Sequence, residues 1–363
     1  MKPFLPDQLP FPNLNWSDYI TQIAKANAAL AKYDGILEGI PNKLILLSPL
    51  MRQEAVLSSR IEGTQATIQE VMEFEADPKA QTAKYNDIQE IQNYREALSY
   101  AKRYLPNKPL GLNLIKEMHG ILLKNVRGQD KNRGLFRTEQ NWIGKDGCKI
   151  EQATYVPPAP NDLMPLLSNW ERYFHQEEKD RLVQLAIIHA QFELIHPFVD
   201  GNGRIGRLLI PIFLAENKVL SNPVFYMSTY LESTRKQYYL RLLEISQNGD
   251  WDNWIRYFLE GVTQQAYSNI EQAKKILKLH GDTKETIDDL MRSRFAIKTI
   301  DFIFERPIFS STEFVANSRI PRASALRALS SLKEAKLLYL VREGKGQKPA
   351  IYAFRKLIEI VSE

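Results

Sequence analysis

Cysteine is almost absent from this chain: Cys148 is the single one among 363 residues. An intrachain disulfide is therefore excluded, and this usage fits a reducing compartment. Long apolar runs are also missing. The longest, near Leu208–Ala215, is interrupted by Pro211, and a membrane-spanning helix needs roughly 20 apolar residues. The start, Met1–Asp7, has no apolar segment of signal-peptide length. We expect a soluble cytoplasmic protein with no membrane partner.

Patterned metal ligands are missing as well. The chain contains five histidines but no His-Glu-x-x-His motif and no paired cysteines, the spacings typical of zinc sites. His189 and His196 are seven residues apart, about two helical turns, and no third ligand has a suitable spacing. We interpret His189 as a core histidine on an apolar helix face, and we expect no metal at His119 or Cys148.

Length and composition indicate a folded protein with more than one domain. Apolar residues make up 44% and charged residues 25%, which is typical of soluble globular chains. Hydrophobic cores usually divide at about 250–300 residues, so the length predicts two or three domains. We expect an N-terminal helical region at 1–100, a core at 101–270 and a C-terminal domain at 285–363, with a linker near Gly281–Lys284.

Apolar spacing predicts a mainly α-helical chain. The first helix is expected to bury the face that contains Ile20, Ile23, Ala24, Ala28 and Ala31. Thr67 and Glu70 form a capping box for one helix, and Asp180 is a good cap for another. The expected helices are Leu44–Ile61, Gln89–Tyr104, Asn113–Leu123, Arg181–Ile195, Arg204–Glu216, Lys236–Ile245 and Trp251–Ala266. A β-hairpin is expected over Asn141–Pro158, because Asp146-Gly147 between apolar strands is typical of a tight turn.

Positive charge gathers in the C-terminal region. The formal net charge is +5, but residues 292–363 contain 14 lysines and arginines against 7 acidic residues, so this region carries +7 and the remainder −2. Such a region indicates an anionic partner for this part of the chain only.

The same region has the pattern of a winged helix-turn-helix. Three helices are expected over Ile297–Phe304, Ser311–Ala316 and Pro321–Lys333, followed by strands over Leu337–Val341 and Ala350–Phe354. Its exposed basic residues would suit the phosphates of DNA: Arg319, Arg322, Arg327, Arg342, Lys345 and Lys348. A solvated basic face on a dimerisation or targeting module is the alternative, because winged helices serve both purposes and no base-reading pattern is visible.

The segment His196–Arg207 combines a glycine-rich turn with the start of a helix. Gly201 and Gly203 flank Asn202, and glycines allow backbone conformations in which successive N–H groups point into one concavity. Such a concavity binds anions. The helix that follows directs its dipole and its free N–H groups at the same point. The segment therefore predicts a site for a polyphosphate.

Charged and titratable side chains surround this predicted anion site. Arg204 and Arg207 share a helix face and can each hold a phosphate in a bidentate manner. Asp200 adds a carboxylate suited to Mg²⁺, which accompanies triphosphates, and His196 can accept a proton at neutral pH. Each feature alone usually has a structural explanation. Their coincidence at one loop-to-helix junction favours transfer of a phosphorus group to a hydroxyl.

The same residues match a known signature. His196–Arg207 resembles the Fic (filamentation-induced-by-cAMP) signature His-Pro-Phe-x-Asp/Glu-Gly-Asn-Gly-Arg-x-x-Arg without departure, and the resemblance extends over about Phe4–Ala266. It implies an all-helical core and transfer of AMP from ATP to a Tyr, Thr or Ser hydroxyl of a protein. It also implies His196 as general base, Asp200 as Mg²⁺ ligand, and a nucleotide site made by Gly201, Asn202, Gly203, Arg204, Ile205, Gly206 and Arg207.

The resemblance extends to a tyrosine pair and to the predicted hairpin. In the family, one tyrosine of such a pair contacts the nucleotide base or ribose, and of Tyr238 and Tyr239 we prefer Tyr238. At least one of them is expected to pack in the core. The hairpin resembles the family's flap, which holds the target's backbone by strand addition, with Ala153–Val156 as its working edge.

An inhibitory segment is expected near Ser58 and Glu62. These residues are four apart and share a helix face, and a glutamate near the end of a helix needs a compensating cation. The segment resembles the family's motif Ser/Thr-x-x-x-Glu-Gly/Asn. The resemblance implies that Glu62 pairs with Arg207 and blocks the productive position of the γ-phosphate.

The expected partners are ATP, an unidentified target protein and the chain itself, through self-modification; a homodimer is a further form of control. Two other functions remain open. One is a DNA-binding regulator whose core only senses nucleotide, although such a sensor would not need the base His196. The other is removal of AMP from a modified protein, with Glu62 positioning water. A minority of the family transfers other phosphorus-linked groups.

Overall fold

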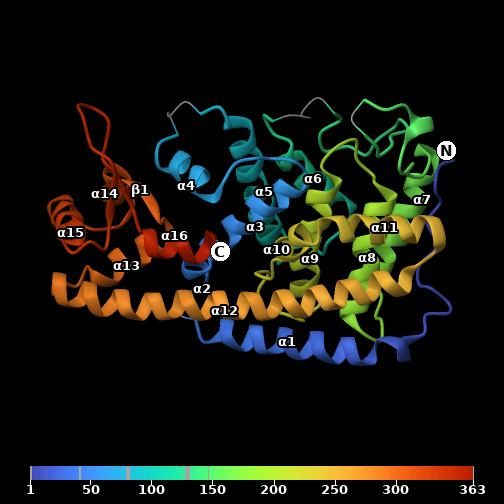
Figure 1. Ribbon diagram of the computed structural model, residues 1–363, viewed down its shortest axis with the longest axis horizontal. Coiled ribbons are helices and arrows are strands. Elements are labelled where there is room, and N and C mark those ends of the chain that lie inside the picture. Colours follow the sequence, from blue (N-terminus) through green and yellow to red (C-terminus); the bar gives the residue numbers. More distant parts are fainter. Residues whose placement is uncertain (1, 41, 79–81, 127–130, 146, 363) are drawn as a thin grey trace. The chain divides into compact units, whose positions relative to one another are not determined.

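The computed structural model describes residues 2–40, 42–78, 82–126, 131–145 and 147–362. In this part of the chain helices dominate, as predicted, and the named strands form one small sheet (Figure 1). Packing divides the chain into two compact units. Unit 1 comprises Met1–Asp34, Leu57–Gly63 and Gln92–Tyr267, and unit 2 comprises Gly35–Val56, Thr64–Ile91 and Ser268–Glu363. The expected domains at 1–100, 101–270 and 285–363 stay a prediction.

Four helices contribute residues to both units: α1 (Ile20–Glu38), α3 (Ser48–Ile61), α5 (Tyr85–Tyr104) and α12 (Trp251–Met291). None of the helices in the described ranges has the length and apolar character required to cross a bilayer. The expected linker at Gly281–Lys284 is wrong, because these residues lie inside α12. A glycine within a helix costs only about 1 kcal/mol, so Gly281 does not end this one.

Unit 1 is built around α8 (Arg181–Ile195) and α9 (Asn202–Glu216), which pack against each other. The indole of Trp170 donates to the carbonyl of Ile188, and that of Trp254 to the carbonyl of Ala186, so two neighbouring helices are tied to α8. The remaining elements of this unit are η1 (Trp16–Tyr19), α6 (Leu112–Leu122), η2 (Ile150–Gln152), η3 (Pro160–Asp162), α7 (Leu163–His175), α10 (Ser228–Ser233) and α11 (Arg235–Asn248). Helices α7 and α10 have no counterpart among the helices expected from the sequence.

The first long helix buries a different face from the one expected. Ile20 is 63% exposed, and Ala24, Ala28 and Ala31 are exposed as well. The buried residues in unit 1 are instead Ala26, Ala29, Leu30 and Tyr33. Alanine occurs on both faces, so apolar spacing alone could not distinguish them. The hydroxyl of Tyr33 donates to the carbonyl of Val224, which holds this face against the core.

Unit 2 contains a three-stranded antiparallel sheet in the order β1-β3-β2. Phe302, Phe309 and Phe314 pack edge to face or stacked at its core, with ring centroids 5.0–5.6 Å apart. The elements are α2 (Lys43–Leu46), α4 (Ile68–Ala76), α13 (Ala296–Glu305), β1 (Ile308–Ser310), α14 (Ser311–Asn317), α15 (Arg322–Glu334), β2 (Tyr339–Arg342), β3 (Ile351–Ala353) and α16 (Arg355–Ser362). Strand β1 was not expected. The assignment as a winged helix stays a prediction.

The predicted flap is much less regular than a hairpin. Ile143 and Tyr155 form a single antiparallel bridge, and the short helix η2 occupies the return segment. Asp146, on which the turn prediction rested, lies outside the described residues. Two residues of the predicted working edge at Ala153–Val156 already have partners. The backbone carbonyl of Val156 accepts a hydrogen bond from the Phe4 N–H, and the side-chain hydroxyl of Tyr155 donates to the carbonyl of Leu194.

Candidate active site

His196 ends helix α8 in a left-handed conformation with φ of 50°. Its Nδ1 lies 3.3 Å from the carbonyl oxygen of Glu193. Because a carbonyl only accepts, the proton belongs on Nδ1, and Nε2 keeps its lone pair. Burial lowers the pKa of His196 to about 4. The imidazole is therefore neutral near pH 7 and can accept a proton, as the prediction requires.

The turn between α8 and α9 is held by Asn202. Its side-chain oxygen accepts the N–H of Phe198, and its amide donates to the carbonyl of the same residue, both at 2.8 Å. Gly201 has φ of +81°, and a Cβ there would lie 3.3 Å from Leu122. Helix α9 begins at Asn202, so its first N–H groups face the turn. These N–H groups are the backbone part of the expected anion site, which stays a prediction, and the Asn202 side chain shapes the turn.

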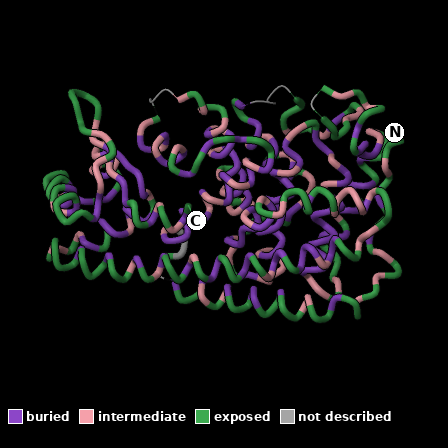
Figure 2. Tube along the Cα trace, in the orientation of Figure 1, coloured by how far each residue is buried: buried purple, intermediate pink, exposed green. Residues whose placement is uncertain are grey.

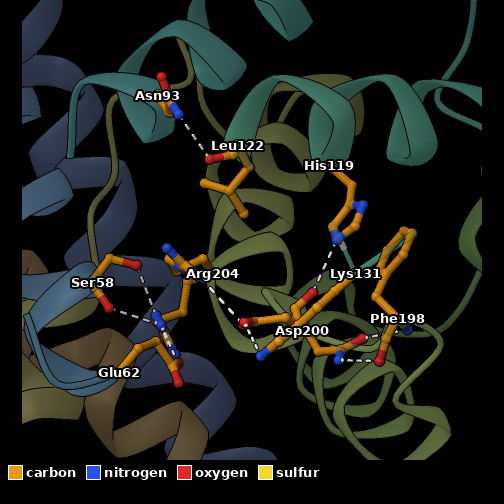
Figure 3. Close-up of polar contacts among 11 residues, drawn as sticks. Ser58, Glu62, Asn93, His119, Leu122, Lys131, Phe198, Asp200 and Arg204 are labelled. Atoms are coloured by element: carbon orange, nitrogen blue, oxygen red, sulfur yellow. Dashed lines mark hydrogen bonds and ion pairs between the residues drawn. The ribbon is translucent and has the colours of Figure 1, made fainter. Parts of the chain in front are cut away.

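Asp200 lies among cations at the rim of this turn (Figure 3). Its carboxylate is 3.1 Å from Nζ of Lys131 and 3.5 Å from a guanidinium nitrogen of Arg204. Its backbone carbonyl accepts a hydrogen bond from Nε2 of His119 at 2.9 Å. No three histidine, cysteine or acidic side chains cluster as metal ligands in the part of the chain that the structure describes. A Mg²⁺ ion would therefore depend on Asp200 and on phosphate oxygens, which is its usual arrangement in phosphoryl-transfer sites.

His119 supports the Asp200 loop, and the sequence analysis missed this role. The Gly134 N–H donates to its Nδ1, and Nε2 donates to Asp200, so the imidazole is neutral with its proton on Nε2. The ring stacks on Phe198 with centroids 3.8 Å apart. Burial lowers the pKa of His119 to about 4, so this arrangement persists at neutral pH.

Arg137 was also missed. Its side chain is 2% exposed and its guanidinium donates to the carbonyl oxygens of His196 and Pro158 at 3.0 and 2.6 Å. Its backbone N–H donates to the carbonyl of Pro197. Arg137 therefore fixes the backbone that carries His196. An isolated arginine beyond the signature carries no sequence signal for this role.

The predicted contact between Glu62 and Arg207 is present. One nitrogen of Arg207, Nη2, lies 2.6 Å from the carboxylate of Glu62 and also donates to the Ser58 carbonyl, while Nε donates to the Ser58 hydroxyl. Burial by itself would raise the pKa of Glu62, but the charge and hydrogen bond of Arg207 lower it below the usual value. The pair is ionic at neutral pH.

Two glycines of α9 make room for two carboxyl groups. A Cβ at Gly203 would lie 2.3 Å from an oxygen of Glu62, and one at Gly206 would lie 2.2 Å from an oxygen of Glu193. Any larger residue at either position would displace the acid. Ile205 is fully buried, and the predicted roles of Ile205 and Gly206 in nucleotide binding stay predictions.

A cavity of about 710 Å³ adjoins these groups. His196, Arg207 and Glu62 line one part of it, together with Gly203 and Glu193. Leu194 of α8 and residues of the flap and of α11 line the rest: Ile143, Gly144, Lys145, Thr154, Tyr155, Lys236, Tyr238, Tyr239, Leu240, Leu242 and Leu243. Its volume falls within the usual range of about 300–1,000 Å³ for small-molecule sites.

Both tyrosines line the cavity, but they differ in exposure. Tyr238 is 1% exposed and its hydroxyl lies 3.0 Å from Nε2 of His189. His189 donates through Nδ1 to the Gly206 carbonyl, so Nε2 accepts the Tyr238 proton. His189 is therefore the core histidine that was expected. Tyr239 is 44% exposed at the cavity, and this geometry favours Tyr239 over the preferred Tyr238 as a contact for nucleotide.

Two family models match consecutive parts of the chain. The model described as Fic/DOC family N-terminal matches residues 20–103, and the model described as Fic/DOC family matches residues 109–214. Together they include the Ser58–Glu62 segment, the helices α8 and α9 and the turn that joins them.

Curated relatives carry the name protein adenylyltransferase Fic. The protein from Drosophila grimshawi is 27% identical over 250 residues, which are 67% of this chain and 45% of the relative. The protein from Drosophila mojavensis is 29% identical over 168 residues, 45% of this chain and 30% of the relative. The chain thus spans less than half the length of these relatives.

Solved structures share the fold. A Fic family protein from Desulfovibrio desulfuricans G20 has a TM-score of 0.61 at 15% identity, covering 96% of this chain and 98% of that one. Fic-1 (residues 134–508) from C. elegans has a TM-score of 0.54 at 20% identity, covering 71% of this chain and 73% of that one.

Proposed function

We propose, on the premise that this chain belongs to the Fic/DOC family, that it is a protein adenylyltransferase. It would transfer the AMP moiety of ATP to a Tyr, Thr or Ser hydroxyl of a protein. The observation that carries this proposal is that one cavity is lined by His196, whose Nδ1 is held by the Glu193 carbonyl, and by the buried guanidinium of Arg207, next to the first turn of α9.

In the proposed reaction the target hydroxyl attacks the α-phosphorus of ATP. The bond from this phosphorus to the oxygen that bridges to the β-phosphate breaks, and pyrophosphate leaves. Nε2 of His196 takes the hydroxyl proton, since Nδ1 is occupied by the Glu193 carbonyl. The N–H groups at the start of α9 and the charge of Arg207 stabilise the phosphate oxygens.

Asp200 is the proposed Mg²⁺ ligand. Its carboxylate is half-buried and pairs with Lys131 and Arg204, so a Mg²⁺ ion would compete with these two cations for its oxygens. Bound with ATP, the metal would neutralise phosphate charge. Arg204 is 4% exposed and would stay beside Asp200.

The proposed enzyme is held inactive by Glu62. The guanidinium of Arg207 is buried and already bonded to Glu62 and Ser58, so a γ-phosphate that needs Arg207 must compete with the carboxylate. ATP would then bind in a pose unsuited to in-line attack. Removal of Glu62 is expected to release Arg207 for the nucleotide.

The test is incubation with α-labelled ATP and Mg²⁺, with label on the protein itself as the readout. Glu62→Gly is expected to incorporate label at least tenfold faster than the unchanged chain. Glu62→Gly with His196→Ala is expected to lose about 10²–10⁴-fold of that rate. Transfer that persists without His196 would refute the mechanism, and a Glu62→Gly protein that folds but transfers no faster would refute the inhibition.

The same experiment separates the alternative of AMP removal. If the chain removes AMP with Glu62 positioning water, Glu62→Gly abolishes release of AMP from labelled protein instead of increasing incorporation.

A further inference from the structure

Glu193 is an acidic residue in the last turn of an apolar helix, α8. Between Leu182 and Ile195 on α8 it is the single residue that is not fully buried. It lies one turn before His196 and lines the same cavity as His196 and Arg207. Its side chain thus faces the proposed nucleotide site.

One oxygen of this carboxyl group is buried without a partner. Among the described residues Oε1 of Glu193 has no hydrogen bond, whereas the carboxylate of Glu62 is bonded to Arg207 at 2.6 Å. A buried polar atom without a partner costs about 1–3 kcal/mol. The unbonded oxygen of Glu193 lies in a cavity wall, so a ligand in the cavity could supply its missing hydrogen bond.

The position along α9 indicates which part of a ligand this carboxyl meets. Gly206 provides the space for Glu193 as Gly203 does for Glu62, and the two glycines are one turn apart, about 4.5 Å along the helix. The Glu193 carboxyl is thus one turn from the place where Glu62 competes for phosphate. This distance suits the ribose–phosphate part of a nucleotide better than its base.

The charge state of Glu193 decides whether a polyphosphate is tolerated there. Burial raises the pKa of Glu193 to about 8. The positive charge of Arg207 lowers this pKa and the negative charge of Glu62 raises it, but burial has the largest effect. The group is therefore mostly a neutral acid near pH 7. A carboxylate would repel phosphate oxygens, but a neutral carboxyl can donate its proton to them in a hydrogen bond.

We propose that Glu193 is a nucleotide-contacting residue, whose neutral carboxyl group donates a hydrogen bond to a ribose or phosphate oxygen. This inference rests on the proposed function, because the ligand is the nucleotide that the transfer reaction consumes. Nucleotide affinity then depends on the proton that Glu193 carries.

Other groups around the cavity do not produce the same dependence between pH 7 and 9. Burial lowers the pKa of His196 to about 4 and that of His189 to about 3, and raises that of Tyr239 to about 12. The pKa of Tyr238 is also raised by burial, that of Glu62 is lowered, and Arg207 stays cationic. Burial also raises the pKa of Tyr155, and the remaining charged groups of the cavity wall are Lys145 and Lys236.

The test measures binding of ADP by calorimetry at pH 7 and pH 9 with the full chain. ADP lacks the γ-phosphate that Glu62 is proposed to exclude, so the inhibition does not interfere. The unchanged chain is expected to bind about tenfold more weakly at pH 9, because a group with a pKa near 8 loses most of its proton over this range. Glu193→Gln keeps a donor without a charge and is expected to bind equally at both values.

Two further variants complete the experiment. Glu193→Ala is expected to bind about three- to tenfold more weakly at pH 7, the loss of one hydrogen bond, and without the dependence on pH. Glu260→Gln, at an exposed position of α12, is expected to behave as the unchanged chain. Equal pH profiles for the unchanged chain and Glu193→Gln would overturn the role of Glu193 alone. No ADP binding by any of these proteins would overturn the proposed function as well.

Discussion

The turn around His196 in unit 1 and helix α15 in unit 2 are both rich in arginine, but they hold it differently. Arg207 is 1% exposed and makes hydrogen bonds to Ser58 and Glu62. Arg322 and Arg327 are exposed on α15, a helix with many exposed residues along its trace (Figure 2). A buried, bonded arginine limits the chemistry that a site can perform, whereas an exposed one indicates only an attraction to negative charge.

Acidification is expected to produce the largest difference in stability between the two units, because it acts on their buried histidines. Burial lowers the pKa of His119, His189 and His196 to about 3–4 in unit 1, against about 6.5 in an unfolded chain. The unfolded state therefore binds protons first as the pH falls below 6.5. Stability that is fully present above that value is lost progressively down to about pH 4.

From pH 7 to pH 5 the three imidazoles are expected to lower the free energy of opening α8 and α9 by about 5–6 kcal/mol. Glu193 acts in the opposite direction, because its pKa of about 8 lies above the unfolded value, and offsets about 2–3 kcal/mol of this loss. A net fall of about 3 kcal/mol is therefore expected. Hydrogen exchange of these helices, corrected for the intrinsic effect of pH, measures it. In unit 2 the described residues include one such imidazole, His280, so α13 to α16 are expected to lose less. Equal losses of opening free energy in both units would contradict the expected difference between them.

Replacement of Arg137 tests whether a buried arginine in unit 1 supports both transfer and stability, whereas a buried arginine in unit 2 supports stability alone. Arg137→Ala leaves the carbonyls of His196 and Pro158 without their donor, so about 3 kcal/mol of unfolding free energy is expected to be lost. Transfer in the Glu62→Gly protein is expected to fall by at least tenfold, because the backbone of His196 loses its support. Urea unfolding and label incorporation measure the two effects.

Arg52 in unit 2 is the matched control. It is 4% exposed and bonded to Ser48, Glu75 and the Glu305 carbonyl. Arg52→Ala is expected to destabilise the protein to a similar degree and to leave transfer by the folded protein unchanged. If Arg137→Ala also left transfer unchanged at a temperature where it is folded, its positioning role would be wrong.

The smallest expected effect concerns DNA, which we propose as the partner of the C-terminal region. Replacement of Arg322 and Arg327 by serine is expected to weaken binding to random duplex DNA a few-fold at low salt and to reduce the salt dependence by about one unit for each arginine. Gel shifts at several salt concentrations measure it. Arg342 is bonded to Asp77 and is expected to contribute less. No binding by the unchanged chain even at low salt would reject the proposal.

Local signals in the sequence predicted several elements closely. Asp180 caps α8 by accepting the N–H groups of Leu182 and Val183 at 2.9 Å, and the capping box of Thr67 and Glu70 is present. These contacts join residues two or three positions apart, so composition and spacing were sufficient. Where apolar residues occurred on both faces, as in α1, spacing was not sufficient.

The chemistry of the turn His196–Arg207 was determined by the sequence, because a glycine-rich turn before a helix forms an anion site from its own backbone. Only the tertiary structure brought Glu62 to Arg207, 145 residues away, exposed Tyr239 in place of Tyr238, and buried Glu193 in the cavity wall. Those outcomes depend on the loss of water around each group, and this is set by side chains from distant parts of the chain.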